Sequence, residues 1–142
     1  MEGQTEYKHA DLTHAIIGAC MEVHTILGSG FQEVIYQRAL SIELKLRGIE
    51  HSREHEMEVF YKDHLVGERR VDFFVEGKVM VELKAVSFMT DDHLAQGLNY
   101  LEAYNLEVGL LINFGARSLQ YKRLLNKKYN PSKSSPASGQ AK

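Results

Sequence analysis

Apolar residues follow a helical spacing over the first third of the chain. Residues 12–27 and 32–47 each place an apolar side chain at every third or fourth position, which is typical of helices that bury one face. Gly28-Ser29-Gly30 separates the two predicted helices, and Gly48 stands where a glycine commonly ends a helix. The predicted buried faces are Leu12, Ala15, Ile16, Ala19, Val23, Ile26 and Leu27 in the first helix, and Ile35, Ala39, Ile42 and Leu46 in the second.

The pattern changes from helical spacing to strands in the middle of the chain. Residues 57–61, 66–75 and 79–86 are rich in β-branched and aromatic side chains and predict three strands. Residues 62–64 and 76–78 are short connections made of turn-forming residues. Because such short connections join antiparallel neighbours, we expect the three strands to form a meander.

The last third of the chain returns to a helix and then alternates again. Residues 91–104 predict a helix, and residues 108–114 are apolar throughout, as in a strand that is covered on both faces. That strand follows a helix, so it can lie parallel to one of the earlier strands. Residues 116–128 predict a last, basic helix. The predicted core positions of the helix over 91–104 are Leu94, Leu98 and Leu101.

This order of elements, ααβββαβα, predicts an α/β fold with a mixed four-stranded sheet flanked by helices. Residues 1–129 are expected to form one domain. Residues 130–142 contain too few apolar residues to build a core and are predicted to be a disordered tail.

Composition and charge narrow the class of protein. The chain has 142 residues, a single cysteine, Cys20, and a net charge of -2. One cysteine excludes an internal disulfide, and Cys20 is expected to be a small buried hydrophobe. The first residues show no secretory pattern, and no apolar run reaches the roughly 20 residues of a membrane helix. We therefore expect a soluble, cytoplasmic protein. Its charge gives no global attraction to nucleic acid, and assembly into a homo-oligomer stays open.

Three charged residues interrupt the most apolar strands. Glu82 and Lys84 lie on one face of the predicted third strand, and Asp72 lies ten residues before Glu82, across a tight turn. Such residues often form solvated ion pairs on an outer face. Met80 shares their face, however, and the later helix and strand must cover part of the sheet. Enclosed carboxylates are usually paired or bind a metal, so the three charges form a candidate site.

The chemistry of this set suits a hard divalent cation. The carboxylates of Asp72 and Glu82, with the backbone carbonyl of Leu83, would give an oxygen site for Mg²⁺ or Mn²⁺. Lys84 could orient or deprotonate an attacking water, or offset charge in the transition state. An aspartate followed on the next strand by E-x-K resembles the motif of the PD-(D/E)XK nuclease superfamily, although Val71 stands in place of the proline that gives the motif its name.

A second segment makes the resemblance more specific. Gly30-x-x-Glu33-x-x-Tyr36 resembles the signature of the GxxExxY protein family, a branch of that superfamily. The resemblance covers residues 12–126, and its other matching blocks are residues 42–49, 70–72, 81–86 and 109–114. It implies a restriction-endonuclease-like core, Asp72 and Glu82 as metal ligands together with Glu33, and Lys84 as the catalytic lysine.

The predicted helix over 91–104 adds a further candidate motif. Gln96 and Tyr100 resemble the Q-x-x-x-Y motif of RecB-type nucleases, and helical geometry places His93 on their stripe. The resemblance implies that Gln96 completes the catalytic set and that His93 and Tyr100 contact substrate. These side chains could instead cover an edge of the sheet or, for His93, be a neutral core or surface histidine.

Two further residues are substrate-binding candidates, each with a plainer alternative. Arg70 is expected on the face of Asp72, where it could bind a phosphate or be solvated. Tyr36 could contact substrate, although packing or a hydrogen bond to the sheet is the commoner role. A zinc site at His51-x-x-x-His55 is disfavoured, because the spacing falls at the entry to a strand.

Three functions are compatible with these residues. The first is a Mg²⁺- or Mn²⁺-dependent nuclease that hydrolyses phosphodiester bonds of nucleic acid, with DNA favoured. The second is a nuclease-fold protein of weak or no activity that binds nucleic acid or a protein partner. The third is a scaffold in which the charged cluster is a buried ion-pair network.

Overall fold

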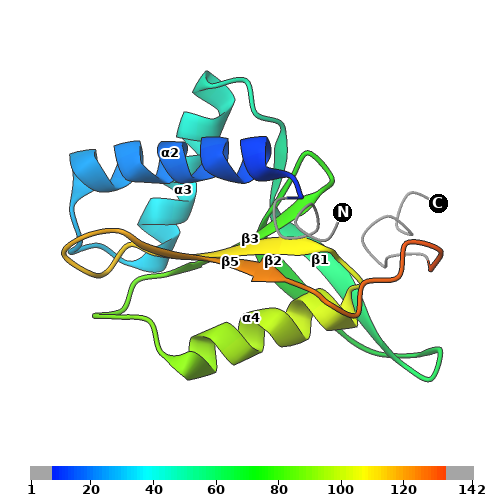
Figure 1. Ribbon diagram of the computed structural model, residues 1–142. Coiled ribbons are helices and arrows are strands. Elements are labelled where there is room, and N and C mark those ends of the chain that lie inside the picture. The colour runs from blue at the N-terminus through cyan, green and yellow to red at the C-terminus, as the bar shows by residue number, and fades with distance from the viewer. Residues whose placement is uncertain (1–7, 134–142) are drawn as a thin grey trace.

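The structure is a computed structural model that describes residues 8–133, so most of the predicted tail over 130–142 lies outside the described residues. Helices α2 and α3 lie on one face of a sheet, and α4 lies on the other (Figure 1). The elements are α2 (Ala10–Leu27), α3 (Glu33–Leu46), β1 (His51–Tyr61), β2 (His64–Val75), β3 (Val79–Lys84), α4 (Asp91–Ala103), β4 (Val108–Asn113) and β5 (Gln120–Leu125).

The sheet has the strand order β1-β2-β3-β4-β5. Strands β1, β2 and β3 form the predicted antiparallel meander, and β4 pairs parallel to β3 after the α4 crossover. The mixed α/β fold is therefore confirmed. Its sheet has five strands, however, and not the predicted four.

The fifth strand replaces the helix predicted over 116–128. Strand β5 pairs antiparallel with β4 along its whole length, from Val108↔Leu125 to Asn113↔Gln120. A fully buried strand needs a hydrogen-bonded neighbour on each side, and β5 supplies the second one. Leu124 and Leu125 pack on opposite faces of the sheet, as successive residues of a strand do.

Helix α3 buries a different face from the predicted one. Of the predicted positions, Ile42 is 63% exposed and Leu46 is 76% exposed. The helix is rotated because two residues with polar groups, Tyr36 and Gln37, are buried and satisfied by hydrogen bonds inside the fold. The buried residues of α3 are Tyr36, Gln37, Leu40 and Leu44.

The other two helices follow their predicted faces in part. In α2, Ile16, Ala19 and Val23 are buried, Cys20 is buried with them, and Ile26 is exposed. In α4 the buried residues are Gly97 and Leu101, and Leu98 is exposed. Gly97 is buried because its missing side chain admits Leu124: a Cβ there would lie 2.6 Å from Leu124 Cδ1. No helix within residues 8–133 is long and apolar enough to span a membrane.

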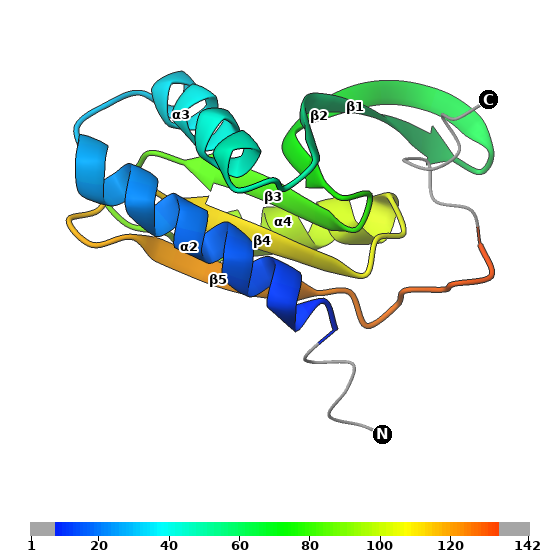
Figure 2. The ribbon, with the colours of Figure 1, turned by 90° about the horizontal axis from the view of Figure 1, so that it is seen from above.

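Strand β2 changes the face that it presents at Asp72. Val71 packs in the core between the sheet and α4, whereas Phe73 packs in the core between the sheet and helices α2 and α3. The strict alternation of side chains along a strand therefore fails between these two residues. Opposite Asp72, Glu54 has a left-handed backbone with φ 53°, and the regular ladder of β1 and β2 is interrupted there. Pairing of β2 with β3 ends at Phe73↔Val81. Beyond this point the β1–β2 hairpin curls away from the sheet (Figure 2).

The parallel strands β3 and β4 end at the same edge of the sheet, and a buried asparagine fixes the loops there. Asn113 Oδ1 accepts hydrogen bonds from the backbone N–H groups of Val86 and Gly115, both at 3.0 Å. Asn113 Nδ2 donates to Val86 O at 3.0 Å and to Gln120 Oε1 at 2.9 Å. The loop after β3 and the loop after β4 are therefore held against each other.

We expect Gly115→Ala to lower the free energy of unfolding by about 2 kcal/mol, because overpacking forces backbone to move. A Cβ at Gly115 would lie 2.4 Å from both N and O of Val86, which are backbone atoms and cannot turn away. Urea denaturation measures the change. Gly67→Ala is the control, because a Cβ there meets nothing within 4 Å. Equal stability of the two variants would contradict this account of the loop.

Candidate metal centre

Asp72 lies at the point where β2 separates from β3. Its Oδ2 accepts a hydrogen bond from the backbone N–H of Leu83 at 2.8 Å, and its Oδ1 accepts one from Gln37 Nε2 at 2.8 Å. The regular β2–β3 pairing has ended at Phe73, so the carboxylate takes the Leu83 N–H that a strand neighbour would otherwise accept. Asp72 is thus fixed between β3 and α3.

Glu82 is the second carboxylate, and it is almost fully buried. Its residue is 5% exposed, and its Oε1 lies 3.5 Å from Arg69 Nη2. Burial, followed by the negative charge of Asp72, raises the pKa of Glu82 to about 8, and Arg69 opposes this shift. Oε2 of Glu82 is buried and contacts no hydrogen-bond partner within the described residues. Such an oxygen requires a proton or a cation to offset its desolvation.

These two carboxylates fit a hard divalent cation. Oε2 of Glu82 is buried, and burial together with the charge of Asp72 raises the pKa of the Glu82 carboxyl group. A cation would replace the lost solvation of this oxygen and offset the repulsion between the two carboxylates. Within residues 8–133, no set of three His, Cys, Asp or Glu side chains lies close enough to hold a metal ion. A cation here would therefore need backbone or water oxygens as further ligands. The Leu83 carbonyl stays a prediction, since it is the Leu83 N–H that contacts Asp72.

Glu33 lies within electrostatic reach of Asp72, Lys84 and His93. Burial and then the charge of Asp72 raise the pKa of Glu33, while Lys84 and His93 oppose this shift. Glu33 begins α3, Lys84 ends β3, and His93 lies in the first turn of α4. The start of α3 therefore lies near the end of β3 and the first turn of α4.

His93 also has a structural role. Its backbone N–H donates to Thr90 Oγ1 at 3.4 Å, and the N–H of Thr90 donates to His93 Nδ1 at 3.1 Å. This reciprocal pair caps the start of α4. Because Nδ1 is the acceptor, the neutral imidazole carries its proton on Nε2.

Tyr100 contacts Arg69, which pairs with Glu82, whereas Gln96 is exposed on α4. The guanidinium carbon of Arg69 lies 4.0 Å from the centroid of the Tyr100 ring, and the same arginine pairs with Glu82. Gln96 is exposed on α4, and none of the contacts described above connects it to the carboxylates. Its catalytic role stays a prediction.

Two substrate-binding candidates make contacts within the fold. Arg70 is exposed and forms ion pairs with Glu54 and Glu56 on the hairpin, so its role in binding phosphate stays a prediction. Its neighbour Arg69 contacts Glu82 instead.

The second candidate, Tyr36, is fully buried, which agrees with packing and hydrogen bonding as the commoner role of such a residue. Its hydroxyl donates to Gly28 O at 2.6 Å and accepts from the N–H of Phe31 at 3.1 Å. Its ring stacks on Phe114 with centroids 4.6 Å apart. The tyrosine of the Gly30-x-x-Glu33-x-x-Tyr36 segment therefore has a structural position.

Asp72 is oriented by a relay of two hydrogen bonds that the sequence pattern did not predict, from Arg53 to Gln37 and from Gln37 to Asp72. Gln37 is 6% exposed, and its Oε1 accepts a hydrogen bond from Arg53 Nη1 at 2.9 Å. This bond fixes the amide so that its NH₂ group faces Asp72. A buried glutamine in the Tyr36-Leu40-Leu44 stripe was a usable signal, but nothing local predicted Arg53 as its partner.

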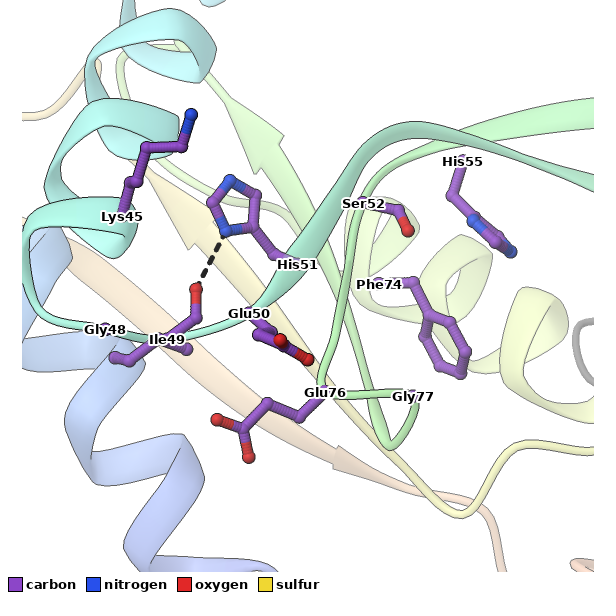
Figure 3. A pocket seen from close by; sticks show the side chains of 10 residues that line it. All are labelled: Lys45, Gly48, Ile49, Glu50, His51, Ser52, His55, Phe74, Glu76 and Gly77. Atoms are coloured by element: carbon purple, nitrogen blue, oxygen red, sulfur yellow. Dashed lines mark hydrogen bonds between the residues drawn. The ribbon is translucent and has the colours of Figure 1, made fainter.

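An open groove in the structure is lined by none of these site residues. It has a volume of about 1010 Å³ and lies among the end of α3, the start of β1 and the β2–β3 turn (Figure 3). The figure shows His51 and His55 apart from each other on its wall. Both ring nitrogens of His51 are already engaged, Nδ1 with Ile49 O at 3.0 Å and Nε2 with Ser41 Oγ at 2.8 Å. Polar contacts and burial, not groove size, therefore locate the candidate site.

Comparisons with known proteins agree with the fold. The model of a family described as "PD-(D/E)XK nuclease superfamily" matches residues 10–124. A crystal structure of SSO0001 resembles the chain with a TM-score of 0.54 at 18% sequence identity, over 87% of this chain and 59% of that one. The chain thus spans less than two thirds of that protein, and the likeness concerns the fold alone. No curated protein matches the chain. The narrower GxxExxY branch stays a prediction.

The raised pKa of Glu82 gives a pH-dependent stability in the metal-free protein. An acid whose pKa is higher in the folded state contributes stability at low pH and loses it as pH rises through the folded value, here about 8. Between pH 5 and pH 8 in EDTA, we expect wild type to lose about 3 kcal/mol relative to Glu82→Gln, measured by urea denaturation. Glu68→Gln, an exposed carboxylate on the same hairpin, should track wild type. A pH-independent difference for Glu82→Gln would contradict the assignment.

The relay through Gln37 predicts an energetic coupling. Gln37→Met should lower the free energy of unfolding by about 2 kcal/mol, because Asp72 Oδ1 loses its donor and Arg53 its acceptor. Arg53→Met alone should have a smaller effect, since Arg53 is exposed. A double-mutant cycle should give a coupling energy above about 0.5 kcal/mol. Strict additivity would show that the two side chains act independently.

Proposed function

Because the chain belongs to the PD-(D/E)XK nuclease superfamily, we propose that it is a single-domain, metal-dependent nuclease that hydrolyses phosphodiester bonds of nucleic acid, with DNA as the favoured substrate. One observation carries the proposal. Oε2 of Glu82 is buried and has no hydrogen-bond partner within the described residues. Burial and the charge of Asp72 raise the pKa of this carboxyl group, and Glu82 lies two residues before Lys84 on the same strand.

The proposed roles follow from the positions of the residues. Asp72 and Glu82 would hold Mg²⁺ or Mn²⁺ with the Leu83 carbonyl and waters as further oxygen ligands. Glu33 would reach the ion through one of those waters, because no three His, Cys, Asp or Glu side chains among the described residues lie close enough to bind one ion together. Such an ion, when bound, would supply positive charge against the phosphate and make a nearby water easier to deprotonate. Lys84 shares a strand face with Glu82, and its positive charge acts on both Glu33 and Glu82, so its ammonium group can donate a hydrogen bond that orients the water or offset charge in the transition state.

The residues that contact Asp72 and Glu82 support these roles. Gln37 and the Leu83 N–H hold Asp72 in one orientation, so its remaining lone pairs keep a fixed direction. Arg69 offsets the charge of Glu82 and lies over Tyr100, which anchors it to α4. We propose that Arg69, in place of Arg70, faces the phosphate when Glu82 engages a cation.

The Arg69–Glu82 ion pair also favours a second function. In a weak or inactive nuclease-fold protein, this buried pair would be structural, and the protein would only bind nucleic acid or a partner. In that case a divalent cation would not displace the arginine. Metal binding, followed separately from cleavage, distinguishes the two functions.

We expect Mn²⁺ at about 100 times its dissociation constant to stabilise wild type by about 2.7 kcal/mol, which corresponds to a rise of roughly 8 °C in the melting temperature. Asp72→Ala should lose most of this rise. Lys84→Ala should keep it and cleave labelled single- and double-stranded DNA at least 100-fold more slowly than wild type.

Glu68→Gln is the matched control, because it removes an exposed carboxylate only four residues from Asp72. It should respond to Mn²⁺ and cleave DNA as wild type does. If wild type and Asp72→Ala respond alike to Mn²⁺, the metal site is wrong. If wild type binds Mn²⁺ and cuts no nucleic acid, the binding function replaces the nuclease.

A further inference from the structure

Three loops gather at the edge of the sheet where β3 and β4 end. Residues 28–32, 85–90 and 114–119 lie side by side there in both views of the ribbon (Figures 1 and 2). The first loop leads into Glu33, and the second leaves Lys84. Two of the three loops therefore adjoin residues of the candidate metal centre, Glu33 and Lys84.

Two of these loops each carry an exposed phenylalanine. Phe31 is 48% exposed and Phe88 is 63% exposed, although phenylalanine is usually buried. Phe31 precedes Glu33 by two residues, and Phe88 follows Lys84 by four. At 3.8 Å between consecutive Cα atoms, their Cα atoms lie at most about 8 and 15 Å from those of the site residues. Both rings are therefore carried on loops that lead directly into or out of residues of the candidate site.

The backbone beside each ring is held by hydrogen bonds. The N–H of Phe31 donates to the buried hydroxyl of Tyr36 at 3.1 Å. On either side of Phe88, the N–H of Val86 donates to Asn113 Oδ1 and that of Met89 donates to Gln120 Oε1, both at 3.0 Å. Exposed aromatic rings on fixed loops are pre-organised surfaces for a flat ligand.

The third loop supplies a cation. Arg117 is exposed on it, and the loop is tied to α2 by His24 Nε2, which lies 3.0 Å from Ala116 O. Arg69 and Lys84 are further cations near the carboxylates, and Asp91 and Asp92 add negative charge in the first turn of α4 beside His93. The net charge of the chain is -2. Phosphate attraction alone therefore gives little affinity for a nucleic acid, and base stacking is the remaining source.

We propose, on the basis of the nuclease function above, that Phe88 and Phe31 stack on unpaired bases on the two sides of the bond to be cut. The substrate is then a single strand or an unpaired segment. In a duplex the faces of the bases are covered by their neighbours, so the two rings have nothing to stack on. A single strand instead offers a π-face at every base, and its phosphates remain free for Arg117 and the metal centre.

The test compares strands that differ only in their bases. Fluorescence anisotropy in Ca²⁺ follows a labelled 20-mer of thymidylate, a 20-mer of abasic sites with the same phosphates, and a duplex. Wild type should bind thymidylate about tenfold more tightly than either other probe. Phe88→Ala should reduce that preference to about twofold or less. Phe31→Leu should reduce it in part, because the Phe31 ring also packs edge-on against Tyr36.

Matched controls lie on the distal hairpin. Tyr61 is 62% exposed and Phe60 is 48% exposed, so Tyr61→Ala and Phe60→Leu remove equally exposed rings far along β1 from Asp72. Both should keep the wild-type preference. Phe88→Ala should keep the wild-type melting temperature and its rise with Mn²⁺, which shows that the metal centre is intact.

Equal binding of thymidylate, abasic strand and duplex by wild type would overturn the proposal, as would an unchanged preference in Phe88→Ala. In either case the exposed rings would belong to a protein contact instead. Neither result touches the nuclease function, which fails separately if wild type and Asp72→Ala respond alike to Mn²⁺.

Discussion

The arrangement of the site depends on one carboxylate that replaces a backbone acceptor. Strand β2 leaves β3 after Phe73↔Val81, and without Asp72 the Leu83 N–H would lack the acceptor that the carboxylate provides. A buried N–H without an acceptor costs about as much as a lost hydrogen bond. Asp72 fills this position, and through Gln37 it also ties β2 to α3. The break in the sheet and the position of the acid are therefore the same structural feature.

The position of Asp72 makes it unfavourable for Glu82 to carry a negative charge. Fixing Asp72 at the end of the ladder brings its charge to Glu82, whose carboxylate is already buried on the α4 face. Arg69 lowers the pKa of Glu82 but does not restore it to the ordinary range, because burial and Asp72 together outweigh one ion pair at 3.5 Å. The pair of acids thus keeps an unfavourable charge interaction, which protonation of Glu82 or a bound cation would relieve.

Sequence patterns predicted those features that depend on near neighbours. The meander, its turn at 76–78 and the approach of Asp72 to Glu82 follow from alternation and from a ten-residue separation. Two errors arose from long-range contacts. Strand β5 forms because β4 needs a second neighbour, and α3 is rotated because Tyr36 and Gln37 find partners inside. The Arg53–Gln37 bond joins residues of different elements, so no local pattern could predict it.

Helix α4 links the parallel strands to the chemistry of the site. A parallel pair requires a crossover, and the crossover from β3 to β4 must start where Lys84 ends. After the loop over residues 85–90, the first turn of α4 carries His93, which lies within electrostatic reach of Glu33. The distance of α4 from the sheet is then set by Gly97, since any side chain at that position would meet Leu124 of β5. Three residues after Gly97, Tyr100 comes close enough for Arg69 to lie over its ring. Strand β5, which the sequence pattern did not predict, therefore helps to set the position of Arg69 relative to Glu82. The charge interactions of Glu82 thus depend on packing at the far edge of the sheet.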